Sequence, residues 1–211
     1  MPEIYSDYPL SIGEFAMSIS VPLSEIHRTV LTWLRNRKDS VLFGAQAVNA
    51  YVGEPRMTVD IDLMSEVAEY VASEICDSLH KTHHIAMHTR VVANGKGFRV
   101  YQLQSEGNRH LVDIRQVASL PPNNSISGVL VILPCDLIAQ KVISMIARKN
   151  TPKSLTDQAD ILRLILAFPE LQAYEGTVLQ AMQRYDATET ATLAWRDLSS
   201  REISPNNDDD Y

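Results

Sequence analysis

Two acidic residues stand one position apart in an apolar, strand-forming run. The run covers residues 56–64 (RMTVDIDLM), and the acids are Asp60 and Asp62. A buried carboxylate costs free energy unless something pairs with it. Residues i and i+2 of a strand point to the same face, and these two positions lie roughly 7 Å apart along the backbone. The pair therefore predicts a cation site. The opposite face, formed by Val59, Ile61 and Leu63, is expected to join the core.

A third acid has the same setting. Asp113 interrupts the apolar run HLVDI at residues 110–114. If this strand lies beside residues 58–64, three carboxylates share one face. Without a cation they would repel one another and raise the pKa of their members. Magnesium prefers oxygen ligands, commonly one or two carboxylates plus substrate phosphates. The cluster therefore favours a two-metal site suited to phosphoryl or nucleotidyl transfer.

A strand–glycine–helix junction precedes the acid pair. The short apolar strand 41–43 ends at Gly44, and the helical run AQAVNAYV begins directly after it. A helix N-terminus at a glycine offers free N–H groups and a favourable dipole to phosphate. The missing side chain also lets a phosphate approach the backbone. Most such junctions are only turns, but the position shortly before Asp60 favours a phosphate site here.

The elements that must position these residues follow from periodicity. Helices are expected at 23–37, 45–52 and 66–82, with a short one near 12–18. Strands are expected at 41–43, 58–64, 84–92, 98–103, 110–117 and 129–133, and PPNNSISG (121–128) is expected to be a loop. The period then changes, and helices are expected at 135–148, 153–167, about 170–184 and about 187–200.

This order of elements predicts an α+β fold with a mixed or antiparallel sheet flanked by helices. The predicted domains are a core at 1–133, a C-terminal helical subdomain at 134–202 and a disordered acidic tail at 203–211.

Composition excludes some classes of protein. The 211 residues are 45% hydrophobic and 21% charged, as in an ordinary globular protein. No apolar run approaches the roughly 20 residues that span a bilayer, and the N-terminus does not resemble a signal peptide. We therefore expect a cytoplasmic protein without a membrane partner. Cys76 and Cys135 are predicted to be buried thiols rather than disulfide or zinc partners.

The net charge of −7 gives no general attraction to nucleic acid. Any contact would need a local basic patch, or else these residues are solvated helix ends. The candidates are Arg35, Arg37 and Lys38, and Arg148, Lys149 and Lys153.

Taken together, FGAQAVNAY followed by RMTVDIDLM resembles the nucleotidyltransferase superfamily that includes DNA polymerase beta. The closest resemblance is to the AbiEii-type abortive-infection toxins, in which an Arg and a Thr commonly precede the acids, as Arg56 and Thr58 do here. That branch also carries a helical Lys, a basic stretch and an Asp-x-x-Asp. The resemblance covers residues 38–165, and the matching downstream residues are Asp136, Lys141, Arg148, Asp157 and Asp160.

The sequence departs from the family pattern at two places. Gly44-Ala45 replaces the usual Gly-Gly or Gly-Ser, and Thr156 stands where a basic residue is expected before Asp157, with Lys153 nearby.

The resemblance implies a nucleotidyltransferase sheet and a magnesium-dependent enzyme that moves a nucleoside monophosphate from a nucleoside triphosphate to RNA (tRNA) or protein. Two Mg²⁺ ions and the catalytic role are implied for Asp60, Asp62 and Asp113, the last helping to activate the acceptor hydroxyl. The leading biological role is the toxin of a toxin–antitoxin pair, with a cognate antitoxin as partner. The nucleotide-binding residues implied are Gly44, Ala45, Gln46, Arg56, Thr58, Lys141 and Asp157.

Other readings stay open. The chain could be a catalytically silent nucleotide-binding or regulatory module, or an antitoxin-type transferase that modifies a partner toxin. Lys141 could be an exposed helix residue. Asp157 and Asp160 could cap their helix or pair with Lys153 and Arg148. The histidines His80, His88 and His110 show no ligand spacing and are not among the predicted site residues.

Overall fold

The computed structural model of the chain describes residues 21–104 and 107–205. The helices are α2 (Leu23–Leu34), α3 (Gly44–Tyr51), α4 (Ala68–His83), α5 (Pro134–Ala147), α6 (Pro152–Ala167), α7 (Thr177–Arg184) and α8 (Glu189–Ser199), with 3-10 turns η1 (Ala93–Gly95) and η2 (Pro169–Gln172). The strands are β1 (Ser40–Phe43), β2 (Ile61–Ser65), β3 (Met87–Val92), β4 (Gly97–Gln102), β5 (Arg109–Gln116), β6 (Asn123–Ile126) and β7 (Val129–Ile132). The predicted helix at 12–18 and the tail beyond residue 205 lie outside the described residues.

The strands form a mixed seven-stranded sheet in the order β3-β4-β5-β2-β1-β7-β6. β2 runs parallel to β5 and β1 runs parallel to β7, while the other neighbours are antiparallel. The α+β class predicted from the sequence is confirmed. The expected adjacency of the two acid-bearing strands is also confirmed, because β2 pairs with β5 along its whole length.

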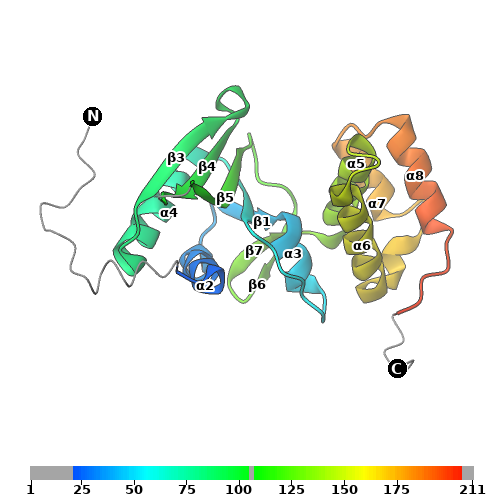
Figure 1. Cartoon of the computed structure of the whole chain (residues 1–211). Coiled ribbons are helices and arrows are strands. Elements are labelled where there is room, and N and C mark those ends of the chain that lie inside the picture. Colours follow the sequence, from blue (N-terminus) through cyan, green and yellow to red (C-terminus); the bar gives the residue numbers. More distant parts are fainter. Residues whose placement is uncertain (1–20, 105–106, 206–211) are drawn as a thin grey trace, which may run out of the picture.

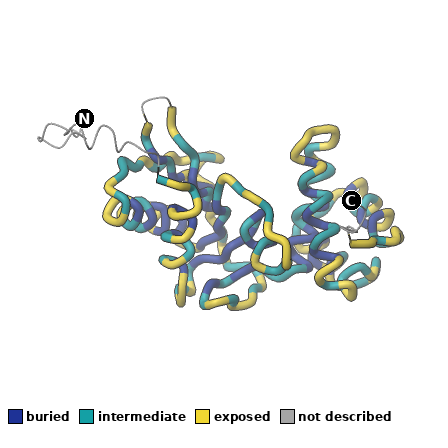
Figure 2. Tube along the Cα trace, turned by 60° about the horizontal axis from the view of Figure 1, so that its bottom comes forward, coloured by how far each residue is buried: buried dark blue, intermediate teal, exposed yellow. Residues whose placement is uncertain are grey.

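Helix α4 packs on the sheet through β2 to β5, and helices α5 to α8 gather on the other side of the molecule (Figure 1). The apolar stripe of α4 is fully buried and includes Val71, Ala72, Ile75 and Leu79. Figure 2 shows buried chain through the sheet and the inner sides of the helices, with exposed loops around them. α3 contacts β1 and β2 as well as α5 and α6, so it joins the sheet to the C-terminal helices.

Several expected boundaries were wrong. The predicted loop 121–128 contains edge strand β6, whose polar run NNSI pairs with β7 and has no apolar alternation to reveal it. β2 begins only at Ile61, so Val59 lies outside the strand and is 65% exposed, whereas Ile61 and Leu63 are buried as expected. The helix expected from about 170 begins at Thr177, after the turn η2.

Two helix ends have local causes. α4 ends at His83, and the next residue, His84, adopts a left-handed conformation (φ 53°), so β3 starts three residues later than expected. α6 begins after Thr151, whose side chain accepts a hydrogen bond from the Ser154 backbone N–H and so caps the helix. No described helix has both the length and the apolar character needed to cross a membrane. The division into domains remains a prediction.

Candidate active site

The strand register brings two of the predicted acids together. In the parallel β2–β5 pair, Asp62 lies directly opposite Asp113, and Asp60 immediately precedes β2. Asp62 and Asp113 share a face of the sheet with Asp60, and all three side chains line one cavity. The buried Ile61 and Leu63 occupy the opposite face. The alternation of β2 thus separates carboxylates from core.

Gly44 lies against one of these carboxylates. A Cβ at Gly44 would stand 1.9 Å from Asp62 Oδ2, which no side chain could tolerate. The residue also has a φ of +68°, a conformation that favours glycine. The cause is the antiparallel β1–β2 pair, in which Phe43 is opposite Asp62 and the chain turns into α3 at the next residue. Only glycine therefore fits between the strand end and the acid.

A β-bulge re-aims a histidine toward the same site. The β4–β5 register shifts so that Val100 pairs with Val112 and Tyr101 with His110, which leaves Leu111 as the extra residue. Such a bulge changes the face to which the following side chains point. Here it brings His110 and Asp113, three apart in sequence, within 3.4 Å (Nε2 to Oδ1), and His110 Nδ1 lies 3.6 Å from Asp60 Oδ2.

His110 therefore joins the site, although it was not among the predicted site residues. Asp60, His110 and Asp113 each offer an atom within 4.8 Å of the others, close enough for one ion. The sequence signal that could have found His110 is the pair of consecutive apolar residues between it and Asp113, both fully buried.

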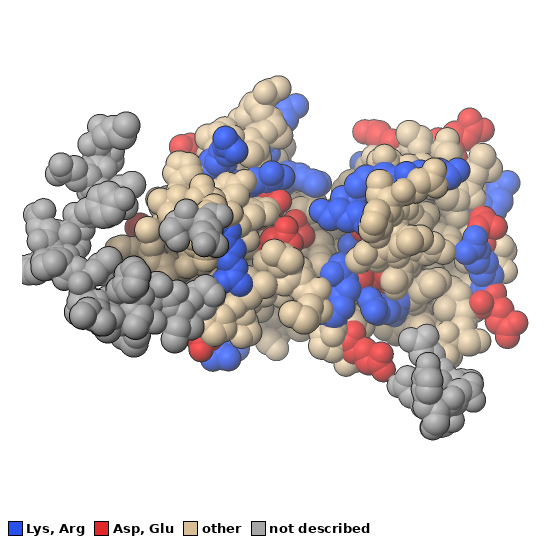
Figure 3. Space-filling model, in the orientation of Figure 1, with Lys and Arg blue, Asp and Glu red and all other residues tan. Residues whose placement is uncertain are grey.

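The cavity has a volume of about 810 Å³ and lies between the sheet and helices α5 and α6. Basic side chains gather on both sides of it, with acidic atoms between them (Figure 3). Six cationic side chains line it, against the four acids Asp60, Asp62, Asp113 and Asp157. The cations are Arg56, Arg99, Arg115, Lys141, Arg148 and Lys153. An anion as large as a triphosphate would find positive charge on both walls.

Asp62 is the least compensated acid of the cluster. Burial raises its pKa to about 6, and the neighbouring charges of Asp60 and Asp113 add to this, while Lys141 and Arg115 act against it. Among the described residues it forms no ion pair. A carboxylate in this setting either holds a proton or needs a cation.

Asp113 is held differently. Burial would raise its pKa, but His110 and Arg99 together lower it. Arg99, its cross-strand partner, donates from Nε to Asp113 Oδ1 at 2.7 Å. In return, Asp113 raises the pKa of His110 above its usual value despite partial burial. His110 is thus poised to carry a proton between two carboxylates.

A second set of acids lies on α6. Asp160 is fully buried and accepts two hydrogen bonds from Arg56, at 2.8 and 2.9 Å. Lys141 Nζ lies 2.8 Å from Asp160 and 3.1 Å from Asp157. Arg148 completes the set, 2.6 Å from Asp157. This ion-pair network joins the loop before Asp60 to helices α5 and α6. Lys141 is therefore a half-buried network member rather than an exposed helix residue.

The remaining predicted residues divide between two places. Ala45 lines the cavity, as does Thr58, whose hydroxyl donates to the Asp60 carbonyl at 3.1 Å. Gln46 lies elsewhere, since its side chain points into a second pocket and forms a hydrogen bond with His27.

Tyr185, which directly follows α7, also lines the cavity, and its hydroxyl donates to the buried Asp136 at 2.8 Å. Sequence reasoning singled out none of Tyr185, Arg99 and Arg115. Arg99 and Tyr185 come from other elements, but Arg115 stands two positions after Asp113 on β5, so strand alternation could have placed it on the same face.

No known family model matches the sequence, and no curated protein matches it. Solved structures do match. The Megavirus polyadenylate synthase has a TM-score of 0.54 at 16% identity over 72% of this chain, which spans only 33% of that protein. A Helicobacter pylori protein provisionally named a nucleotidyltransferase has a TM-score of 0.52 at 12% identity, over 84% of this chain and 91% of its own.

The antibiotic-resistance factor ANT(2'')-Ia is similar over 82% of this chain and 95% of its own, with a TM-score of 0.50 at 16% identity. Likeness at this level of identity concerns architecture. The chain has the nucleotidyltransferase fold, as the sequence resemblance implied.

Proposed function

We propose that the protein is a metal-dependent nucleotidyltransferase. The observation that carries the proposal is the parallel register of Asp62 and Asp113, which aims two carboxylates into a cavity walled by cations. The nucleotidyltransferase fold adds support. In the proposed reaction an acceptor hydroxyl attacks the α-phosphorus of a nucleoside triphosphate. The bond from the α-phosphorus to the bridging oxygen breaks, pyrophosphate leaves, and the hydroxyl proton passes to the protein.

The donor set fits magnesium. Asp60, Asp62 and Asp113 offer carboxylate oxygens, the ligands that Mg²⁺ prefers, and burial beside the other two acids raises the pKa of Asp62, a setting in which a cation would stabilise the carboxylate. We propose that these three acids hold two Mg²⁺ ions, with His110 beside them. When bound, the ions would offset the charge on the phosphates and on the developing pyrophosphate.

The chain's own residues then have separate tasks. Asp113 would accept the acceptor's proton, with His110 able to share it at Nε2. Gly44 and Ala45, at the start of α3, would present backbone N–H groups to the terminal phosphates. Lys141 and Arg56 would supply positive charge, and Asp157 would hold Lys141 and Arg148 in place. Thr58 would fix the chain entering Asp60.

The acceptor and the biological role follow from the family resemblance. We propose RNA (tRNA) or protein as acceptor, and a toxin of the AbiEii type with a cognate antitoxin as the leading role, acting in the cytoplasm. An antitoxin-type transferase that modifies a partner toxin is the second reading. A silent nucleotide-binding module is the third.

Turnover separates these readings. The purified protein would be incubated with Mg²⁺ and each of labelled ATP, GTP, CTP and UTP, together with total cell RNA or total protein. We expect label to pass to one class of acceptor from one or two of the nucleotides, and Asp62→Asn to remove it. Nucleotide binding without transfer to either acceptor pool would favour the silent module.

A further inference from the structure

A second pocket lies behind α3, on the side away from the acids. Its volume is about 580 Å³, within the roughly 300–1,000 Å³ of small-molecule sites. It is bounded by α2, α3 and the β6–β7 hairpin, and it shares no lining residue with the acid-lined cavity. Any occupant would therefore be distinct from the proposed triphosphate.

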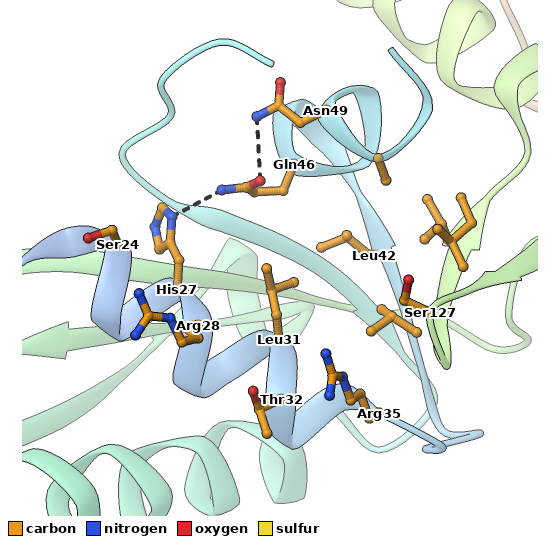
Figure 4. A pocket seen from close by; sticks show the side chains of 14 residues that line it. Ser24, His27, Arg28, Leu31, Thr32, Arg35, Leu42, Gln46, Asn49 and Ser127 are labelled. Carbon is orange, nitrogen blue, oxygen red and sulfur yellow. Dashed lines mark hydrogen bonds between the residues drawn. The ribbon is translucent and has the colours of Figure 1, made fainter. Parts of the chain in front are cut away.

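The pocket has an apolar middle between two polar ends. Figure 4 shows Ser24, His27 and Arg28 at one end and Leu31 and Leu42 in the middle. The other end carries Thr32, Arg35 and Ser127. Arg28 lies on α2 and Arg35 is the first residue after its end, seven positions further along, which corresponds to about 10 Å along the helix axis.

Both arginines are available to a ligand. Arg28 and Arg35 are exposed, and among the described residues neither forms an ion pair. Other arginines on this part of the chain are engaged: Arg37, for example, pairs with Asp39. The chain as a whole has a net charge of −7. Two arginines that are unpaired within the described part of the chain, beside the apolar side chains of Leu31 and Leu42, therefore give this pocket a local positive charge that favours an anionic ligand.

We propose that this pocket binds a small amphipathic anion, with its acidic group at the Ser24–Arg28 end and its apolar body over Leu31 and Leu42. Both ends offer a hydroxyl and a guanidinium, and the Ser24–Arg28 end is favoured because the half-buried Gln46 amide, bonded to His27, lies beside it. The proposal does not depend on transferase activity.

The same end of the pocket is linked to the loop that leads to Asp60. Gln46 Nε2 lies 3.0 Å from His27 Nδ1, and Asn49 Nδ2 lies 3.4 Å from Gln46 Oε1. Asn49 then exchanges two hydrogen bonds with the Arg56 backbone, accepting from its N–H at 3.0 Å and donating to its carbonyl at 2.8 Å. A ligand that orders His27 and Gln46 would therefore steady Arg56.

The test uses 8-anilinonaphthalene-1-sulfonate, an aromatic body with one anionic group, and its uncharged counterpart N-phenyl-1-naphthylamine, followed by fluorescence. We expect saturable binding of the sulfonate and much weaker binding of the neutral compound. Loss of an exposed charged contact reduces affinity by up to a few-fold. Because Arg28→Glu also places a negative charge beside the sulfonate, this variant should bind the probe about tenfold more weakly. Arg35→Glu, a matched reversal at the other end, should change binding less than about threefold.

Lys153→Glu serves as the control for the other cavity, because Lys153 is exposed and lines only the acid-lined site. It should leave probe binding unchanged. Equal binding by Arg28→Glu and the parent, or a loss confined to Lys153→Glu, would overturn the proposed site. Hydrogen exchange of the Arg56 amide should slow on saturation with the probe. Unchanged exchange at full occupancy would overturn the link to the loop.

Discussion

Two groups of acids lie on the two sides of one cavity, and they are compensated in opposite ways: the half-buried Asp60, Asp62 and Asp113 line its sheet side, whereas the buried Asp157 and Asp160 belong to α6, where Asp157 lines the cavity. On α6, Asp160 has Arg56 and Lys141 within hydrogen-bond distance, and these partners lower its pKa. On β2, Asp62 has no ion-pair partner among the described residues, and its pKa rises to about 6. The paired acid is typical of a group that holds structure together. An acid that, like Asp62 among the described residues, has no ion-pair partner and a raised pKa is typical of a functional site, where a bound metal ion would compensate its charge.

The largest expected effect comes from the unpaired acid. Asp62→Asn should reduce nucleotidyl transfer to background while the protein stays folded, because the amide keeps the shape beside Gly44 but loses the charge. Transfer in the turnover assay and circular dichroism check the two halves of this prediction. Retained transfer by a folded variant would assign Asp62 a structural role.

The paired acid should behave in the opposite way. Asp160→Asn would leave the guanidinium of Arg56 and the ammonium of Lys141 poorly compensated in a buried setting. Breaking a buried pair typically costs about 3–5 kcal/mol. Asp160 also pairs with Arg163 at 3.5 Å, and the Arg56 and Arg163 side chains are 24% and 39% exposed, so we expect a cost toward the lower end. Urea unfolding measures it. A stability equal to the parent would show that the network contributes little.

A pH series sharpens the same contrast. Because the pKa of Asp62 is raised from 3.8 to about 6 on folding, the folded state binds its proton more tightly. The resulting stability is fully present below pH 3.8 and is lost as the pH rises through about 6. In EDTA, the parent should therefore lose up to ~3 kcal/mol relative to Asp62→Asn between pH 4 and pH 7. Parallel stability curves for the two proteins would contradict this.

Lys141 bridges the two walls and should give the smallest of these effects. It binds Asp157 and Asp160, yet its charge also reaches Asp62. Loss of a charge-assisted contact to phosphate costs roughly 1.5–3 kcal/mol, so Lys141→Met should weaken nucleotide affinity or turnover about ten- to hundredfold. Lys141→Arg should recover part of it. Parental binding by Lys141→Met would place α5 outside the phosphate site.

Strand alternation predicted that Asp60 and Asp62 point to one face, because alternation is a local rule. That Asp113 joins them depended on the condition that its strand lies beside theirs, which the pairing of β2 with β5 fulfils. Regular alternation places His110 on the face opposite Asp113, and it joins the site because of the bulge at Leu111, of which the two consecutive apolar residues before Asp113 were the sequence sign. The side chain of Gln46 was expected at the phosphates. It lies in the other pocket because α3 begins at Gly44, and in a helix that begins there Gln46 faces His27 of α2.

The partners of the α6 acids could be anticipated from the sequence only in part. Pairing with Arg148 was among the alternatives considered for Asp157, and the structure has it. The bond between Arg56 and Asp160 joins residues 104 positions apart. Such contacts depend on how α6 packs beside α3, which no local pattern specifies.

The most direct test of the account is thermal stability with nucleotide in the presence and absence of a divalent ion. Melting temperatures would be measured for the parent and for Asp62→Asn, with ATP, GTP, CTP or UTP, in Mg²⁺ and in EDTA. A ligand that binds only the folded state raises the melting temperature by mass action. The account predicts that at least one nucleotide stabilises the parent in Mg²⁺, that EDTA removes the effect, and that Asp62→Asn largely lacks it. Equal stabilisation in EDTA, or equal stabilisation of Asp62→Asn, would contradict a metal-dependent triphosphate site at these acids.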